Sequence, residues 1–127
     1  ATEAQLAEAI EKAAGSRLLN LVGKTSLKEL LAVIDRAGVL IAPDTGPAHM
    51  GTTVGTPVIG LYAASNPLRS GPYLSLDHTV NNYPQALSEA RSVDVDAVRW
   101  GTRVRSTVAM DSITIDQVTA KLDAILG

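Results

Sequence analysis

Two short, uninterrupted apolar runs constrain the fold of this chain more than any other feature. Residues 39–42 read Val-Leu-Ile-Ala, and residues 58–62 read Val-Ile-Gly-Leu-Tyr. Continuous runs of this length are typical of strands buried on both faces, as in a parallel sheet covered by helices. The sequence therefore predicts an α/β fold with a Rossmann-like parallel sheet flanked by helices and joined by right-handed crossovers.

Four helical patterns surround these runs, and each carries a start signal. Three begin with a capping box, in which a Thr or Ser is followed three residues later by Gln or Glu. The boxes start at Thr2, Ser26 and Thr114, and the fourth pattern has Pro47 in its first turn. The predicted helices span residues 2–14, 26–37, 47–54 and 114–126.

The remaining segments are predicted to be short strands and loops. Residues 18–22 form a short apolar run that predicts a strand, and residues 78–80 predict a short edge strand. Residues 63–76 are rich in Ser, Pro and Gly and predict a long loop, which in compact domains is usually functional or mobile. Residues 84–111 stay unassigned, apart from a short helix considered for residues 95–100.

Composition limits the class of protein and of partner. The chain has 127 residues, 46% of them hydrophobic, which suits one domain with one core. A net charge of -2 without a Lys/Arg run argues against nucleic acid and anionic membrane as electrostatic partners. Cysteine is absent, and no apolar stretch approaches the roughly 20 residues of a membrane span. Because the helical pattern starts at once and no initiator Met is present, we interpret the chain as part of a longer protein.

The loop over residues 43–46 is the strongest candidate for a ligand site. It joins the carboxyl end of an apolar run to a helix start, and ligands of open α/β sheets bind at that edge. The amino terminus of a helix there offers unpaired N–H groups and a partial positive charge to a phosphate. Gly46 lets an anion approach the backbone, and Thr45 can donate its hydroxyl. The N–H groups of Ala48 and His49 are expected to point outward along the helix axis.

Two side chains of this segment have alternative interpretations. A carboxylate repels a diphosphate, so Asp44 is expected to accept backbone N–H bonds and set the loop. The alternative is that Asp44 or Thr45 is merely a helix N-cap. His49 is either a satisfied structural histidine or a donor to a phosphate oxygen or a sugar. No ligand spacing connects it to His78, so no metal site is predicted.

Two basic residues follow neighbouring strands and are further candidates for binding phosphate. Lys24 comes after the predicted 18–22 strand and would lie at the same sheet edge as Asp44, where it could neutralise phosphate charge. Arg69 follows the 58–62 strand and could face a diphosphate or an acceptor phosphate. For both residues the alternative is an ordinary solvent-exposed side chain.

Residues near position 100 are interpreted as structural. Trp100 is taken for a packing residue, and Arg99 and Arg103 are taken for solvated side chains. The Gly-Lys-Thr sequence at 23–25 is not a P-loop, because that motif needs a glycine where Leu18 stands.

Several segments together resemble the signature of the ADP-heptose:lipopolysaccharide heptosyltransferase family, glycosyltransferase family 9. The main motif is Asp44-Thr45-Gly46-Pro47-Ala48-His49, and the supporting segments are residues 21–30, 55–62 and 66–72. The resemblance covers residues 2 to about 75 well and is weaker at 98–101. It implies a GT-B fold, in which two Rossmann-like domains enclose the active site. The chain would then be part of the carboxyl-terminal domain, which binds the nucleotide-sugar donor.

The resemblance also implies a reaction and a set of donor contacts. The reaction is inverting transfer of heptose from ADP-L-glycero-D-manno-heptose to the lipopolysaccharide inner core, with no cofactor and no bound metal. The family's donor contacts fall on Asp44, Thr45, Gly46 and His49. A family acidic residue near the ribose corresponds to Glu3, with Gln5 as the alternative.

The catalytic aspartate and the acceptor pocket of the family lie in an amino-terminal domain. No catalytic residue is therefore expected within residues 1–127, and the chain alone is expected to bind donor at best. The resemblance implies a full-length enzyme of the bacterial cytoplasm, acting at the inner face of the inner membrane, with peripheral membrane association left open. Two alternatives remain: another nucleotide-sugar transferase or epimerase, and a non-catalytic Rossmann-like binding module.

Overall fold

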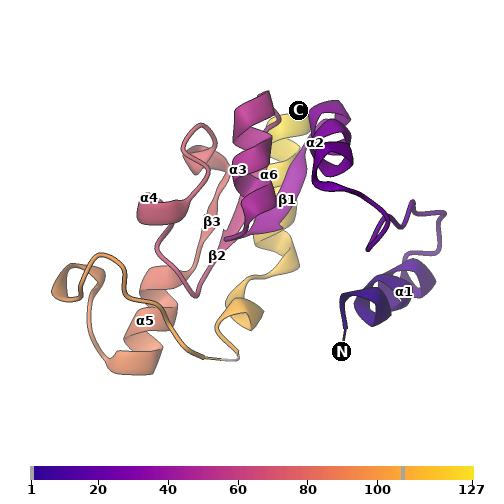
Figure 1. The fold of residues 1–127 in the computed structure, drawn as a ribbon. Coiled ribbons are helices and arrows are strands. Elements are labelled where there is room, and N and C mark those ends of the chain that lie inside the picture. The colour runs from indigo at the N-terminus through magenta and orange to yellow at the C-terminus, as the bar shows by residue number, and fades with distance from the viewer. Residues whose placement is uncertain (1, 107) are drawn as a thin grey trace.

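A three-stranded parallel sheet forms the centre of the structure, a computed structural model that describes residues 2–106 and 108–127 (Figure 1). The strands are β1 (Leu40–Pro43), β2 (Val58–Tyr62) and β3 (Val80–Asn81), in the order β1-β2-β3. Leu40 pairs with Val58, and Tyr62 pairs with Asn81. The predicted parallel sheet and the Rossmann-like α/β class are confirmed.

Within the described residues, six α-helices surround the sheet or lie beside it. They are α1 (Glu3–Ala13), α2 (Leu27–Arg36), α3 (Gly46–Val54), α4 (Pro67–Ser70), α5 (Tyr83–Arg91) and α6 (Ile115–Leu126). All three predicted capping boxes form with both of their hydrogen bonds. In the box of α2, bonds from the backbone and the side chain of Ser26 lower the pKa of Glu29. No helix in the described part of the chain is long and apolar enough to cross a membrane.

Helices α3 and α6 cover opposite faces of the sheet (Figure 1). One core cluster joins α3 to the sheet through Ala42, Ala48 and Val58. A second cluster lies between the loop after β2 and α5, with Ala63, Tyr83 and Leu87 all at most 1% exposed. The first cluster seats the amino end of α3 at the carboxyl end of β1, and the second anchors the segment around Val104 beside that edge.

The predicted strand over residues 18–22 is wrong. The structure gives this segment no strand and instead a turn, closed by the Lys24 N–H on the Leu21 carbonyl at 3.0 Å. A strand needs a neighbouring strand to pair with its backbone, and among the described residues β1 pairs with β2 alone. The segment interacts instead with α1, where Asn20 Nδ2 donates to Glu11 Oε2 at 3.1 Å. As a result α1 and the chain that follows it stand apart from the sheet (Figure 1).

Other differences from the sequence prediction are smaller. The strand expected over 78–80 is β3, shifted to Val80–Asn81 and preceded by a 3₁₀ turn at Leu76–His78. The predicted long loop over 63–76 contains the short α4. The short helix considered for 95–100 is a single 3₁₀ turn, Val95–Ala97.

Thr56 joins α2 to the sheet through one buried hydrogen bond, from its Oγ1 to the Ile34 carbonyl at 2.7 Å. We expect Thr56→Val to lower the free energy of unfolding by about 1–2 kcal/mol, because the bond is lost while the volume is kept. Thr53→Val is the matched control, since its bond to the His49 carbonyl is made on an exposed surface. Urea denaturation of both variants measures the difference, and equal losses would contradict the role assigned to Thr56.

Candidate functional site

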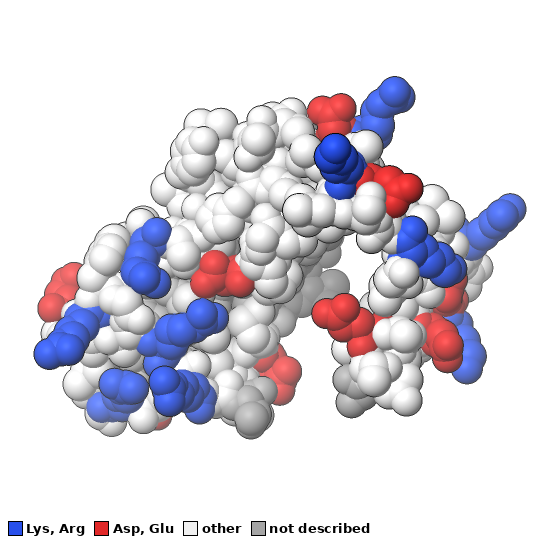
Figure 2. All heavy atoms as spheres, viewed as in Figure 1, with Lys and Arg blue, Asp and Glu red and all other residues white. Residues whose placement is uncertain are grey.

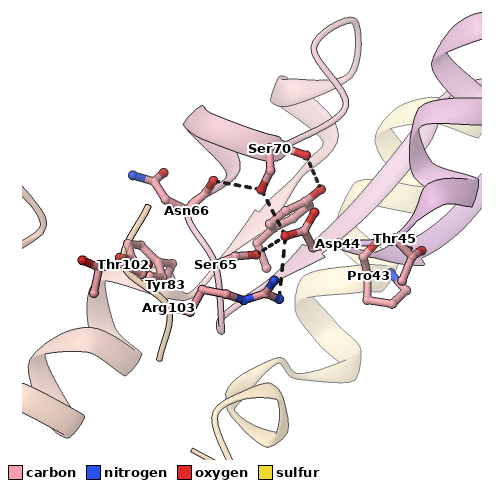
Figure 3. A network of polar contacts seen from close by, with 10 residues as sticks. Pro43, Asp44, Thr45, Ser65, Asn66, Ser70, Tyr83, Thr102 and Arg103 are labelled. Atoms are coloured by element: carbon pink, nitrogen blue, oxygen red, sulfur yellow. Dashed lines mark hydrogen bonds and ion pairs between the residues drawn. The ribbon is translucent and has the colours of Figure 1, made fainter. Parts of the chain in front are cut away.

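The carboxyl ends of β1 and β2 bring two loops together at one edge of the sheet. Asp44 follows β1 directly, and Ser65 lies three residues beyond the end of β2. Because the two strands are parallel, both loops leave the sheet on the same side. Figure 3 shows the side chains from these loops converging on the Asp44 carboxylate.

Asp44 holds this edge together. Its Oδ2 accepts hydrogen bonds from Ser65 Oγ at 2.6 Å and from Ser70 Oγ at 3.1 Å (Figure 3). Arg103 places Nη2 4.0 Å from the same oxygen, and the Asp44 side chain is only 18% exposed. The prediction that Asp44 accepts backbone N–H bonds is wrong, because its partners in the described chain are two hydroxyls and a guanidinium. The negative charge of Asp44 is therefore partly compensated at this edge of the sheet.

Ser70 is held at two points, which fixes α4 against the sheet. Its hydroxyl donates to Asp44, and its carbonyl accepts the Tyr62 hydroxyl at 3.1 Å. The Tyr62 ring is 1% exposed. Burial, together with the negative charge of Asp44, raises the pKa of Tyr62 to about 12. Tyr62 is thus a neutral hydrogen-bond donor at physiological pH, and the loop after β2 is tied to both strands.

The first turn of α3 keeps only part of the predicted donor set. The Ala48 N–H donates to the Thr45 carbonyl at 3.1 Å and Ala48 is fully buried, so the prediction that it points outward to a ligand is wrong. Thr45 occupies the N-cap position, but its hydroxyl donates to the Pro43 carbonyl at 3.3 Å and makes no cap bond. Thr45 therefore takes the N-cap position that the alternative interpretation named, but neither its side chain nor that of Asp44 makes a cap bond.

Two groups of this turn are open to solvent. Gly46 is exposed, and its N–H has no protein acceptor within residues 2–106 and 108–127. His49 is also exposed, and its ring has no polar partner in the same part of the chain. The interpretation of His49 as a satisfied structural histidine is therefore wrong. Helix α3 presents a backbone donor and an imidazole beside the Asp44 network.

The comparisons with known proteins agree on one family. Residues 1–96 match the family model of glycosyltransferase family 9 (heptosyltransferase). The chain belongs to this family. The lipopolysaccharide core heptosyltransferase OpsX of Haemophilus influenzae is 40% identical over 103 residues, which are 81% of this chain and 30% of OpsX. Lipopolysaccharide heptosyltransferase 3 of Escherichia coli is 44% identical over 46 residues, 36% of this chain and 14% of that protein.

The match thus spans less than a third of the length of these curated relatives. No solved structure matches the chain significantly. The motif that carried the resemblance to glycosyltransferase family 9, Asp44 to His49, lies inside the matched residues and at the edge described above.

The remaining candidate residues of this family 9 chain lie elsewhere or at the margin of the site. Lys24 donates to the Asn20 carbonyl at 3.0 Å, and no described contact joins it to the Asp44 loop. Its predicted position at the sheet edge depended on the 18–22 strand, which does not form. Glu3 lies in the first turn of α1, which stands apart from the sheet (Figure 1). Arg69 lies on α4 at the site, with its guanidinium packed against Gly101.

Several residues of the site were not predicted from the sequence. Ser65 and Ser70 lie in the Ser-rich loop after β2. The position of this loop directly after a strand was the sequence signal that could have identified them as site residues. No sequence signal pointed to Arg103, because it lies in the region that the sequence left unassigned. Its interpretation as a solvated side chain is incomplete, because it also pairs with Asp44. Trp100 is 62% exposed, so its interpretation as a packing residue is wrong.

The raised pKa of Tyr62 predicts a specific loss of stability in alkali. Its folded-state pKa of about 12 exceeds its ordinary value of 10, so the contribution is complete below pH 10 and lost as pH rises toward 12. We expect Tyr62→Phe to be about 1 kcal/mol less stable at pH 7, because the bond to Ser70 is lost. Between pH 10 and 12 its free energy of unfolding should then fall less than that of the wild type. Urea denaturation across this range measures both effects.

Tyr73→Phe is the control for this comparison, because Tyr73 is 70% exposed. It should follow the wild type at every pH. A Tyr62→Phe variant that lost stability as steeply as the wild type above pH 10 would contradict the assignment.

Proposed function

We propose that this chain is the donor-binding part of an inverting heptosyltransferase that uses ADP-heptose and acts on the lipopolysaccharide inner core. The observation that carries the proposal is the exposed amino end of α3, where Gly46 and His49 lie free beside a partly compensated Asp44. The heptosyltransferase names of the related proteins support the choice of donor and acceptor.

The donor diphosphate would lie across the amino end of α3. The Gly46 N–H, the His49 ring and, after release from Pro43, the Thr45 hydroxyl are the donors for its oxygens. The positive end of the helix adds to this attraction. Arg69 on α4 and Arg103 supply positive charge, and Arg103 together with two serine hydroxyls offsets the repulsion from Asp44.

These groups would contribute to catalysis by stabilising the leaving group. When the bond between the sugar and the diphosphate breaks, negative charge grows on the departing oxygen. Donors that are already in place stabilise this charge without reorganising, and single donors of this kind are often worth about 3 kcal/mol. Residues 44–49 would therefore assist departure of the nucleoside diphosphate rather than activate the acceptor.

The group that activates the acceptor is proposed to lie outside residues 1–127. The resemblance to the family assigns the catalytic aspartate and the acceptor pocket to an amino-terminal domain. We therefore expect this chain to bind donor without transferring sugar, and the full-length enzyme to act at the cytoplasmic face of the inner membrane. Donor binding is proposed to need neither cofactor nor metal.

Calorimetry with ADP tests the site. We expect His49→Ala to weaken ADP binding at least about tenfold, because a hydrogen bond to a charged group is worth roughly 1.5–3 kcal/mol. Asp44→Ala should weaken it too, because Ser65 and Ser70 lose their common acceptor. His78→Ala is the matched control, since His78 lies with Gly55 and Pro57 at the opposite end of β2.

Wild-type binding in both Asp44→Ala and His49→Ala would remove these residues from the site. UDP and GDP should compete with ADP only weakly, and equal competition would favour another nucleotide-sugar enzyme. Addition of a chelator should leave ADP binding unchanged, and loss of binding would overturn the metal-independent mode.

A further inference from the structure

Basic side chains gather on one face of the molecule, over α5 and the segment that follows it (Figure 2). Residues 97–106 contain three arginines and no acidic residue. The three, all exposed, are Arg99, Arg103 and Arg105. Arg69 joins them from α4, because its guanidinium packs against Gly101. Together with Trp100, these four arginines form what we call the arginine face.

Trp100 lies at the tip of a tight turn on this face. The Thr102 N–H donates to the Arg99 carbonyl at 2.9 Å, so Trp100 and Gly101 are the two central residues of the turn. The Trp100 side chain is large and mostly apolar, yet the residue is 62% exposed. The turn therefore presents an indole to the surroundings with a guanidinium directly beside it in the chain.

The backbone beneath the arginine face is anchored to the core. The Tyr83 hydroxyl donates to the Thr102 carbonyl at 2.8 Å, and the Val104 N–H donates to the Ala64 carbonyl at 2.9 Å. Val104 is 4% exposed and belongs to the second core cluster, as does Tyr83. The arginines on either side of Val104 therefore project from a fixed segment, and the exposure of Trp100 does not come from a loose loop.

Most guanidinium groups of this face are available to an external anion. Arg103 pairs with Asp44 at 4.0 Å. Within residues 2–106 and 108–127, no carboxylate lies within 4.0 Å of the guanidinium groups of Arg69, Arg99 or Arg105. A guanidinium can donate two parallel N–H bonds to a phosphate, so arginines are well suited to binding phosphate groups.

The local charge of the arginine face differs from that of the whole chain. The four arginines, with Asp44 and Asp96 beside them, leave a formal charge of +2, whereas the whole chain carries -2. Charges farther away than the Debye length, about 8 Å at physiological ionic strength, are largely screened. The low net charge of the chain argued against an anionic membrane as a partner, but it does not describe this face.

We propose that the arginine face docks the protein on an anionic lipid bilayer, with Arg99 and Arg105 on lipid phosphates and Trp100 among the headgroups. An amphipathic indole is suited to the boundary between water and lipid, and basic side chains are attracted to anionic lipids. A single-stranded nucleic acid would need several aromatic side chains for successive bases, and this face has one. The choice of a bilayer also rests on the proposed function, whose acceptor is a lipid.

Sedimentation of the chain with vesicles tests the docking. The chain is expected to bind vesicles of phosphatidylethanolamine and phosphatidylglycerol, and to bind phosphatidylcholine vesicles much more weakly. Binding should fall as salt rises from about 0.1 M to about 1 M, because the Debye length shrinks from about 10 Å to about 3 Å. Trp100 is the only tryptophan of the chain, so its emission should shift to shorter wavelength on contact with the anionic vesicles.

Variants identify the face that docks. One basic residue near an anionic membrane strengthens binding about fivefold, so the double variant Arg99→Gln, Arg105→Gln should bind the anionic vesicles roughly 25-fold more weakly. Trp100→Ala should also weaken sedimentation with them. The matched control is the double variant Lys28→Gln, Arg36→Gln, which removes the same charge from exposed residues of α2. It should bind the vesicles as the wild type does.

Absence of binding to anionic vesicles would overturn the docking surface, and so would equal losses in the two double variants. Displacement of the chain from vesicles by a single-stranded oligonucleotide that binds more tightly would favour a nucleic acid and overturn the bilayer. ADP calorimetry separates this proposal from the donor function. ADP binding without vesicle binding would leave only the donor function standing, and vesicle binding without ADP binding would leave only the docking surface.

Discussion

The Asp44 carboxylate is the contact on which the rest of this edge depends. A single oxygen accepts two serine hydroxyls and lies 4.0 Å from a guanidinium, and these groups come from three separate segments. Without it, the loop after β2 would lose its link to β1, and α4 would keep only the Tyr62 bond to Ser70. One oxygen thus links the amino end of α3, the α4 loop and the Arg103 segment.

This arrangement explains how an acidic residue can belong to a motif that is proposed to bind phosphate. An isolated carboxylate would repel the ligand, but this one is mostly buried and hydrogen-bonded, with a cation beside it. Its carboxylate interacts with groups of the protein itself, and the groups that lie on the exposed face of the loop are Gly46 and His49. The loop is therefore divided into a side that holds the structure and a side that is open to ligand.

The sequence predicted the parts of the fold that local patterns control. Ser26 and Thr114 begin helices because their side chains and the residue three positions later satisfy backbone donors within one turn. The strands β1 and β2 could be predicted because a continuous apolar run is typical of a strand that is buried on both faces of a helix-covered sheet. The strand over 18–22 failed for the opposite reason: strand formation depends on a partner, and an apolar run carries no information about whether one is present.

The residues of the candidate site also divide into those that local patterns predict and those that depend on distant contacts. Asp44, Gly46 and His49 could be selected as candidates because a strand, a loop and a helix start lie consecutively in the sequence. The predicted outward direction of the Ala48 N–H was wrong because the first turn closes tightly on the Thr45 carbonyl. Arg103 could not be predicted, because its contact with Asp44 arises from packing between distant segments. The Arg103 segment, for example, is placed by the bond from Val104 to Ala64.

Among the residues that the structure describes, no strand pairs with the outer side of β1, and Ile41 on that strand is 46% exposed. A row of unpaired backbone groups beside an apolar side chain is a template for any extended segment that meets it. This edge would therefore govern whether copies of the isolated chain associate with one another.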